Sequence, residues 1–229
     1  MHVHTPRSVL NNGFGDDFDA YARTFFQRAI EREIAVVGVT DYFLIRGYRE
    51  LRELQADESR LVDLLGKEQA AQAAEILLLP NIELRLNELI KVGSPEPRVA
   101  LHVIFGEDVD PAEIENNFLH QLHYLSEADP DDLDERPALT VPNLEASGRR
   151  LKEQHERFRG QTDLKAGMEQ AVVSHDEITK VLRGKRHFRK RHLLILAADE
   201  HLSKVDWDGP GHITRKVPVQ KACFFPPTL

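Results

Sequence analysis

Short apolar runs alternate with longer amphipathic segments along most of the chain. The apolar runs cover residues 34–39, 76–82, 99–105 and 192–197 and consist mainly of Val, Ile and Leu. Runs of this length and composition are typical of buried β-strands, and helical segments between them are typical of an α/β fold. The pattern therefore predicts a mostly parallel sheet whose strands are connected by helices.

The segments between these runs have helical periodicity. Residues 16–33 carry an apolar stripe of Phe18, Tyr21, Phe25, Phe26 and Ile30. Residues 48–74 form one long helix or two shorter ones, and their inward positions are Leu51, Leu54, Leu61 and Leu65. Pro111 is suited to the first turn of another helix, and Ser174 with Glu177 forms a capping box. These helices are predicted to pack on the sheet as scaffold.

The middle of the chain departs from strict alternation. Residues 142–158 and 161–170 predict a pair of helices inserted between the fourth and fifth strands, and we assign no chemistry to this insertion at 142–172. No linker divides the chain, so residues 1–229 are predicted to form a single domain.

Polar residues with metal-binding chemistry follow several of the predicted strands. His2 and His4 flank one residue, so in an extended backbone both imidazoles point to the same side. Asp41 and Glu83 come at the ends of two apolar runs, and His102 lies within a third. In α/β folds the functional groups gather where the parallel strands end. We therefore expect these residues to converge on one site although they are distant in sequence.

Composition limits the kinds of site and surroundings that the protein can have. Cys223 is the one cysteine in the sequence, so an internal disulfide and a thiolate zinc cage are excluded. Any metal would be held by nitrogen and oxygen atoms. The sequence contains no apolar stretch near the roughly 20 residues that span a bilayer and no signal-peptide pattern, which predicts a cytoplasmic protein.

Charge is unevenly distributed around a formal net charge of −8. Acidic residues crowd into 127–135 and indicate a solvated surface loop. A basic cluster comprises Arg183, Lys185, Arg186, Arg189, Lys190 and Arg191. This basic cluster is a candidate phosphate-binding or nucleic-acid-binding surface, and the alternative is a helix C-terminus whose dipole favours cations.

The ordered set HVHTP, VGVTDY, LLPNIEL and LHVIF resembles the PHP (polymerase and histidinol phosphatase) superfamily. The segments SVLNNGFGDDFDAY, TDYFLIRGY, NIELRLN and WDGPGHITRK are most similar to the amino-terminal PHP module of TrlF-type SMC-like or AAA-like ATPases. The resemblance implies a distorted seven-stranded β/α barrel. It also implies one to three Mn, Zn or Fe ions and hydrolysis of phosphoesters.

The resemblance also implies roles for individual residues. His2 and His4 match the first metal-binding pair, Glu83 the carboxylate that bridges two metals, and His102 a later ligand. Asp41 matches the aspartate of a Thr-Asp-His motif whose histidine is replaced here by Tyr42. Glu83 and Asp41 are thus the candidate catalytic residues. His212 follows a Gly/Pro turn and is a further candidate ligand.

The carboxyl end of the chain departs from the family pattern. The Ser-Asp-x-His sequence expected on a late strand does not occur after Lys190, where Asp199-Glu200-His201 follows an alanine, and residues 222–229 indicate a sixth strand or its edge. The barrel is therefore predicted to be truncated before its last strand. A natural short relative, one half of a split gene and a fragment are the three explanations.

Three functional hypotheses follow from these observations. The first is a metal-dependent phosphoesterase. In its finer form this protein is a nuclease that works with an SMC-like or AAA-like ATPase chain or domain in antiphage defence. It is also expected to form an oligomer. The second is a catalytically degenerate PHP-like module for binding or assembly, and the third is a phosphatase of small metabolites. The sequence has neither a Ser-His-Asp triad pattern nor a Walker A motif, which argues against acyl transfer and autonomous ATP hydrolysis.

Overall fold

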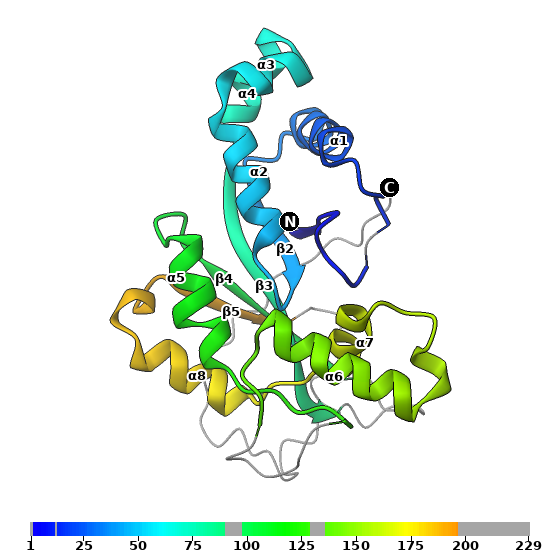
Figure 1. Ribbon diagram of the computed structural model, residues 1–229. Helices are drawn as coiled ribbons and strands as arrows, with labels where there is room; N and C mark the ends of the chain where they lie inside the picture. The colour runs from blue at the N-terminus through cyan, green and yellow to red at the C-terminus, as the bar shows by residue number, and fades with distance from the viewer. Residues whose placement is uncertain (1, 12, 90–97, 129–135, 197–229) are drawn as a thin grey trace.

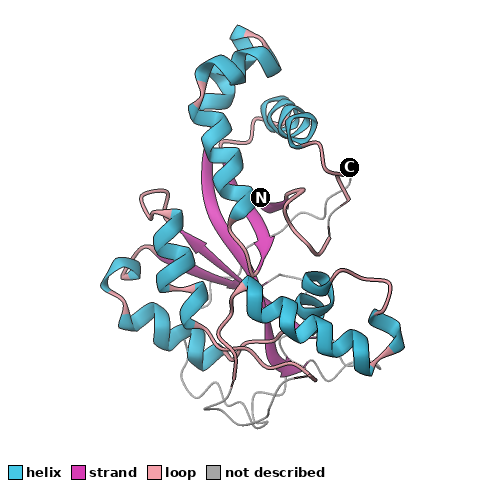
Figure 2. Ribbon diagram, in the orientation of Figure 1, coloured by secondary structure: helices cyan, strands magenta, loops and turns pink. Residues whose placement is uncertain are grey.

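The computed structural model describes residues 2–11, 13–89, 98–128 and 136–196 (Figures 1 and 2). Five strands form one sheet in the order β1-β2-β3-β4-β5. Their bounds are β1 His2–His4, β2 Val36–Tyr42, β3 Leu77–Leu89, β4 Arg98–Phe105 and β5 His192–Leu196. Each predicted apolar run therefore overlaps a strand. Residue 197, the last of the fourth run, lies outside the described residues.

The direction of strand pairing differs from the prediction of a mostly parallel sheet. β1, β2 and β3 pair in parallel, whereas β3 with β4 and β4 with β5 pair antiparallel. Only residues 90–97 separate β3 from β4. A parallel pairing needs a crossover of roughly a dozen residues or more, so this connection is too short for one. The described strands form a mixed sheet, and the seven-stranded barrel stays a prediction.

The helices of the amino-terminal half match the apolar stripes of the sequence. They are α1 Phe18–Glu31, α2 Arg46–Ala56, α3 Glu58–Leu65 and α4 Lys67–Ala74. The segment predicted as one or two helices is thus three. Asp57 ends α2 and caps α3 by accepting a hydrogen bond from the Arg60 amide, and Gly66 separates α3 from α4 at a φ of 78°.

The remaining helices follow β4. They are α5 Pro111–Asn117, η1 Leu119–Gln121, α6 Val141–Gln154, η3 Glu156–Phe158, α7 Asp163–Gln170, α8 His175–Gly184 and η4 Arg186–Phe188. The helical pair predicted between the fourth and fifth strands is present as α6 and α7. A Cβ on Gly148 would lie 1.8 Å from the Asp163 carbonyl oxygen, so only glycine permits this close approach. Figure 1 shows α1–α4 in the upper part of the view and α5–α8 in the lower part, with β3 extending from one group to the other.

The two faces of the sheet differ in chemistry. Residues paired across neighbouring strands point to the same side, and alternate residues point to opposite sides. One face carries Val39, Ile82 and Leu101, each at most 1% exposed and part of the main hydrophobic core. We call this the packed face. The other, which we call the polar face, carries His2, His4, Thr40, Tyr42, Asn81, Glu83, Arg85 and His102.

No helix within the described ranges combines the length and apolar character needed to cross a membrane.

Candidate metal and phosphoester site

Three histidines and a glutamate from three strands meet on the polar face. His4 of β1 aligns with Thr40 of β2, and Glu83 of β3 aligns with His102 of β4. The His4 Nε2 atom lies 3.1 Å from Glu83 Oε2, and the rings of His2 and His102 are 4.8 Å apart. The structure therefore brings together four of the residues predicted to form the site, although 100 positions separate His2 from His102.

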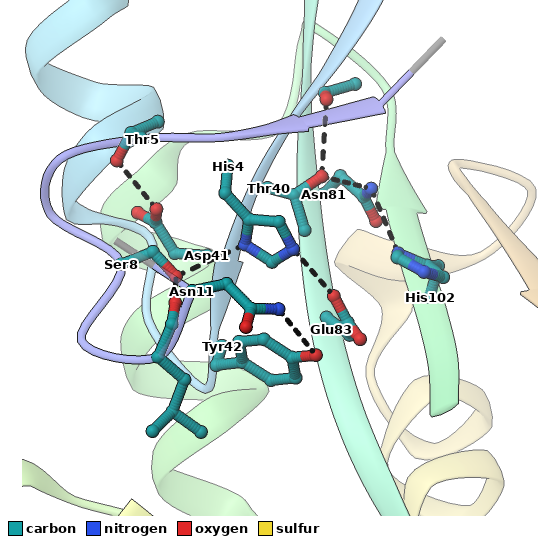
Figure 3. Close-up of polar contacts among 12 residues, drawn as sticks. His4, Thr5, Ser8, Asn11, Thr40, Asp41, Tyr42, Asn81, Glu83 and His102 are labelled. Atoms are coloured by element: carbon teal, nitrogen blue, oxygen red, sulfur yellow. Dashed lines mark hydrogen bonds and ion pairs between the residues drawn. The ribbon is translucent and has the colours of Figure 1, made fainter. Parts of the chain in front are cut away.

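Ser8 determines which nitrogen of His4 faces Glu83. The Ser8 hydroxyl donates its single proton to the Leu10 carbonyl at 2.7 Å, and the same oxygen lies 3.2 Å from His4 Nδ1 (Figure 3). The His4 Nδ1–H must then be the donor to Ser8. Metal-binding histidines commonly hold their second nitrogen in this way. His4 is thus oriented with Nε2 toward Glu83, as a ligand would require.

Asn81 links Thr40 to His102 on the same face. Its Nδ2 donates to Thr40 Oγ1 at 2.7 Å and lies 3.2 Å from His102 Nδ1. All three side chains are at most 2% exposed. The sequence analysis did not single out Asn81, although its position two residues before Glu83 on a strand predicts that it shares the face of Glu83.

Tyr42 occupies the position where the Thr-Asp-His motif of the PHP superfamily, which the sequence resembles, has a histidine. Its ring stacks on His4 with centroids 5.1 Å apart, and Asn11 donates to its hydroxyl at 3.4 Å. The Arg85 guanidinium also lies over this ring, with its Cζ 5.4 Å from the ring centroid. Burial raises the pKa of Tyr42 well above its usual range, and Glu83 adds to the rise. The phenol is therefore neutral at pH 7 and packs against a candidate ligand.

Asp41 lies on the packed face, away from the candidate ligands. Its carboxylate accepts hydrogen bonds from the Thr5 hydroxyl and the Gly47 amide, both at 2.7 Å (Figure 3). Because side chains alternate along β2, Tyr42 and Asp41 cannot face the same side. The contacts of Asp41 tie β2 to the loop after β1 and to α2, and its predicted metal-binding or catalytic role stays a prediction.

Burial and neighbouring charges favour a cation at the polar face. Burial, with help from His102, lowers the pKa of His2 to about 4, and burial lowers the pKa of His102. For Glu83 burial acts to raise the pKa, but the His4 hydrogen bond and the charges of His102 and His4 lower it overall. At pH 7 this leaves the imidazoles of His2 and His102 neutral beside a carboxylate, which is the donor chemistry of a divalent metal site.

The geometry fits a metal ion in part. Two ligand atoms each about 2.1 Å from one ion and at right angles are about 3.0 Å apart. The 3.1 Å separation of His4 Nε2 and Glu83 Oε2 matches this spacing. Within the ranges that the structure describes, no group of three or more His, Cys, Asp or Glu side chains is placed to hold a metal ion. A third protein ligand from this set therefore requires the ring of His2 or His102 to turn.

The residues of the predicted basic cluster are not at this face. His212 lies outside the described residues. The basic cluster spans the end of α8, η4 and the approach to β5, and most of its side chains are exposed. β5 begins at His192, which pairs with the last residue of β4. Because β4 runs antiparallel to β3, the cluster lies at the end of the sheet where β1–β3 begin, opposite to the end where they reach His4 and Glu83.

Comparisons with known proteins found little similarity. No family model matches the chain, and neither does any curated protein sequence. A solved structure from Bifidobacterium adolescentis, described as a "putative metal-dependent phosphoesterase", aligns with a TM-score of 0.36 and 14% identity. The alignment covers 86% of this chain and 65% of that chain, less than two thirds of its length. At this TM-score the likeness establishes neither a shared fold nor a shared activity.

Proposed function

We propose that the chain is a metal-dependent phosphoesterase module whose site is the polar face of the sheet. The observation that carries the proposal is the convergence of His2, His4, Glu83 and His102 on this face from three strands. Separate segments of sequence thereby supply imidazole and carboxylate donors to one place. Buried polar groups are costly unless they are paired, so their concentration on one face favours a functional role.

Individual side chains have distinct tasks in this proposal. A bound divalent cation supplies activation of water and neutralisation of phosphate charge. His4 through Nε2 and Glu83 through Oε2 would hold it, because these atoms already have the spacing of two ligands of one ion. Ser8 keeps His4 in the required orientation. Arg85 lies two residues beyond Glu83 on the same face and provides positive charge for a phosphate.

The finer form of the proposal is a nuclease. Its support is the exposed basic cluster, which has the chemistry of a phosphate-backbone contact. β5 begins opposite Phe105, three residues along β4 from His102, so a substrate that contacts both the cluster and the polar face must extend along the sheet. The ATPase partner, the oligomer and the role in antiphage defence rest on the sequence resemblance alone.

The second candidate is a catalytically degenerate binding module. Tyr42 in the position of a family ligand favours it, because its neutral phenol is a poor ligand for Zn²⁺ or Mn²⁺. The lack of a preformed three-ligand group within the described residues favours it as well. In this alternative the polar face keeps its fold and binds a partner without hydrolysis.

Hydrolysis of a small chromogenic phosphodiester with Mn²⁺, Zn²⁺ or Fe²⁺ tests the proposal. We expect Glu83→Gln to reduce the rate at least about a hundredfold, because the amide keeps the volume but loses the charge that holds the cation. Glu68→Gln makes the same chemical change on exposed α4 and serves as the matched control. No hydrolysis by wild type with any of the three ions, on DNA, RNA or the small ester, favours the binding module.

A further inference from the structure

The amide of Asn81 has one oxygen that the fold leaves unused. Asn81 is 1% exposed, and its Nδ2 contacts both Thr40 Oγ1 and His102 Nδ1 (Figure 3). Its Oδ1 is buried and has no hydrogen-bond partner among the described residues. A buried amide oxygen without a partner is destabilising. A rotation of the Asn81 amide that gives Oδ1 a hydrogen-bond donor would therefore remove this unpaired acceptor.

This orientation determines the tautomer of His102. Because the Asn81 Nδ2 is a donor, His102 Nδ1 must accept, and a neutral imidazole that accepts at Nδ1 carries its proton on Nε2. An Nε2–H nitrogen has no lone pair for a cation. His4 shows the opposite arrangement, since its Nδ1–H donates to Ser8. The Nδ1 atoms of these two candidate ligands thus differ, since that of His4 carries a proton and that of His102 does not.

Both neighbours of Asn81 accept the reversed amide. A hydroxyl and a neutral imidazole nitrogen can each donate or accept, according to where the proton sits. If the amide rotates by half a turn, Oδ1 replaces Nδ2 and accepts from His102 Nδ1–H and from the Thr40 hydroxyl, which gives up its 3.3 Å hydrogen bond to the Gly38 carbonyl. The His102 ring then presents Nε2 as a lone pair.

We propose that Asn81 is a positioning residue that holds His102 as the Nε2–H tautomer in the metal-free protein and releases Nε2 by rotating its amide when a divalent cation binds. The His102 tautomer concerns the metal-free protein alone, whereas the release of Nε2 rests on the proposed function. Thr40 is the partner that makes both amide orientations acceptable.

The tautomer is tested without metal by long-range ¹⁵N–¹H NMR of histidine-labelled protein at pH 8 with a chelator, with His102→Gln to assign the signal. We expect His102 to be protonated at Nε2 in wild type. Asn81→Asp, which offers only acceptor atoms, should move the proton to Nδ1. Asn81→Leu should abolish the preference, and if it fails to fold, the isosteric Asn81→Asp decides alone. An unchanged His102 tautomer in Asn81→Asp overturns the proposal.

The release step is tested by calorimetric titration of the same proteins with Zn²⁺. We expect Asn81→Leu to weaken Zn²⁺ binding about 10–100-fold, the usual loss when a group that orients a ligand is removed. In a His102→Gln background the same substitution should have no further effect. A loss that persists in that background overturns the release step. Wild type that binds no Zn²⁺ while the tautomer responds to Asn81→Asp contradicts the proposed function and the release step, but upholds the positioning of His102.

Discussion

The packed and polar faces of the sheet are built from alternate residues of the same strands. Ile82 and Leu101 on the packed face are at most 1% exposed, and so is Asn81 on the polar face, while Glu83 and His102 are at most 5% exposed. Burial is therefore similar at these positions, and chemistry is what differs. The packed face is held by apolar contact, whereas the polar face is held by hydrogen bonds and one ion pair. Such a departure from an apolar interior is expected at a functional site.

The largest expected effect on stability is at the packed face. Ile82→Ala should lower the free energy of unfolding by about 2–5 kcal/mol, because a fully buried side chain is replaced by a cavity. Glu83→Gln, one residue along the strand, should lower it by only about 1–2 kcal/mol, because the amide keeps the volume and one acceptor for His4. Urea denaturation of the two variants and wild type without metal makes the comparison. Equal losses would contradict the different roles of the two faces.

Asp41 is an acidic group on the packed face and should make stability fall as pH rises. Burial raises its pKa from 3.8 to about 6, so the folded state holds a proton that the unfolded state has lost. The contribution is complete below about pH 4 and is lost as pH rises through 6, by about 2–3 kcal/mol. Asn in place of Asp keeps an acceptor for Gly47 and removes the charge, while it places an N–H where Thr5 now donates.

Denaturation of wild type and Asp41→Asn from pH 4.5 to 7.5 isolates this effect. The difference between the two curves should shift in favour of the variant as pH rises. A difference that is independent of pH would show that Asp41 is ionised at little cost.

A smaller effect is expected at Ser8. Ser8→Ala removes the acceptor for His4 Nδ1–H and should weaken Zn²⁺ binding about tenfold while lowering stability by about 1 kcal/mol. Ser59→Ala on exposed α3 is a control for loss of a hydroxyl. If Ser8→Ala binds Zn²⁺ as wild type does, His4 is oriented by other contacts.

The smallest effect on stability is expected from the basic cluster. Replacing Arg186, Arg189 and Arg191 by Gln should change the free energy of unfolding by less than about 1 kcal/mol, because these side chains are exposed. The same variant should bind single-stranded DNA more weakly and with a flatter dependence on salt. Filter binding at several salt concentrations measures both. Unchanged binding would remove the support for a nuclease.

The sequence predicted elements more successfully than their relations in space. α1 and its buried aromatic residues follow from helical periodicity, and the strands follow from apolar runs. The antiparallel return of β4 was not predicted, because an apolar run does not specify the direction in which it pairs. Asp41 was assigned to the site by motif, whereas strand alternation places it on the packed face. Ser8 lies in a loop and has no periodic signal that connects it to His4.

Metal content tests the central claim most directly. Wild type and a His2→Ala, His4→Ala double variant are exposed to Mn²⁺, Zn²⁺ and Fe²⁺ in turn, dialysed, and measured by elemental analysis, with His120→Ala, a change at a histidine of η1, as the control. We predict at least one equivalent of one of these ions in wild type and in the control, and loss of most of it in the double variant. Wild type that stays metal-free with all three ions, or a double variant that retains the metal, would contradict the account.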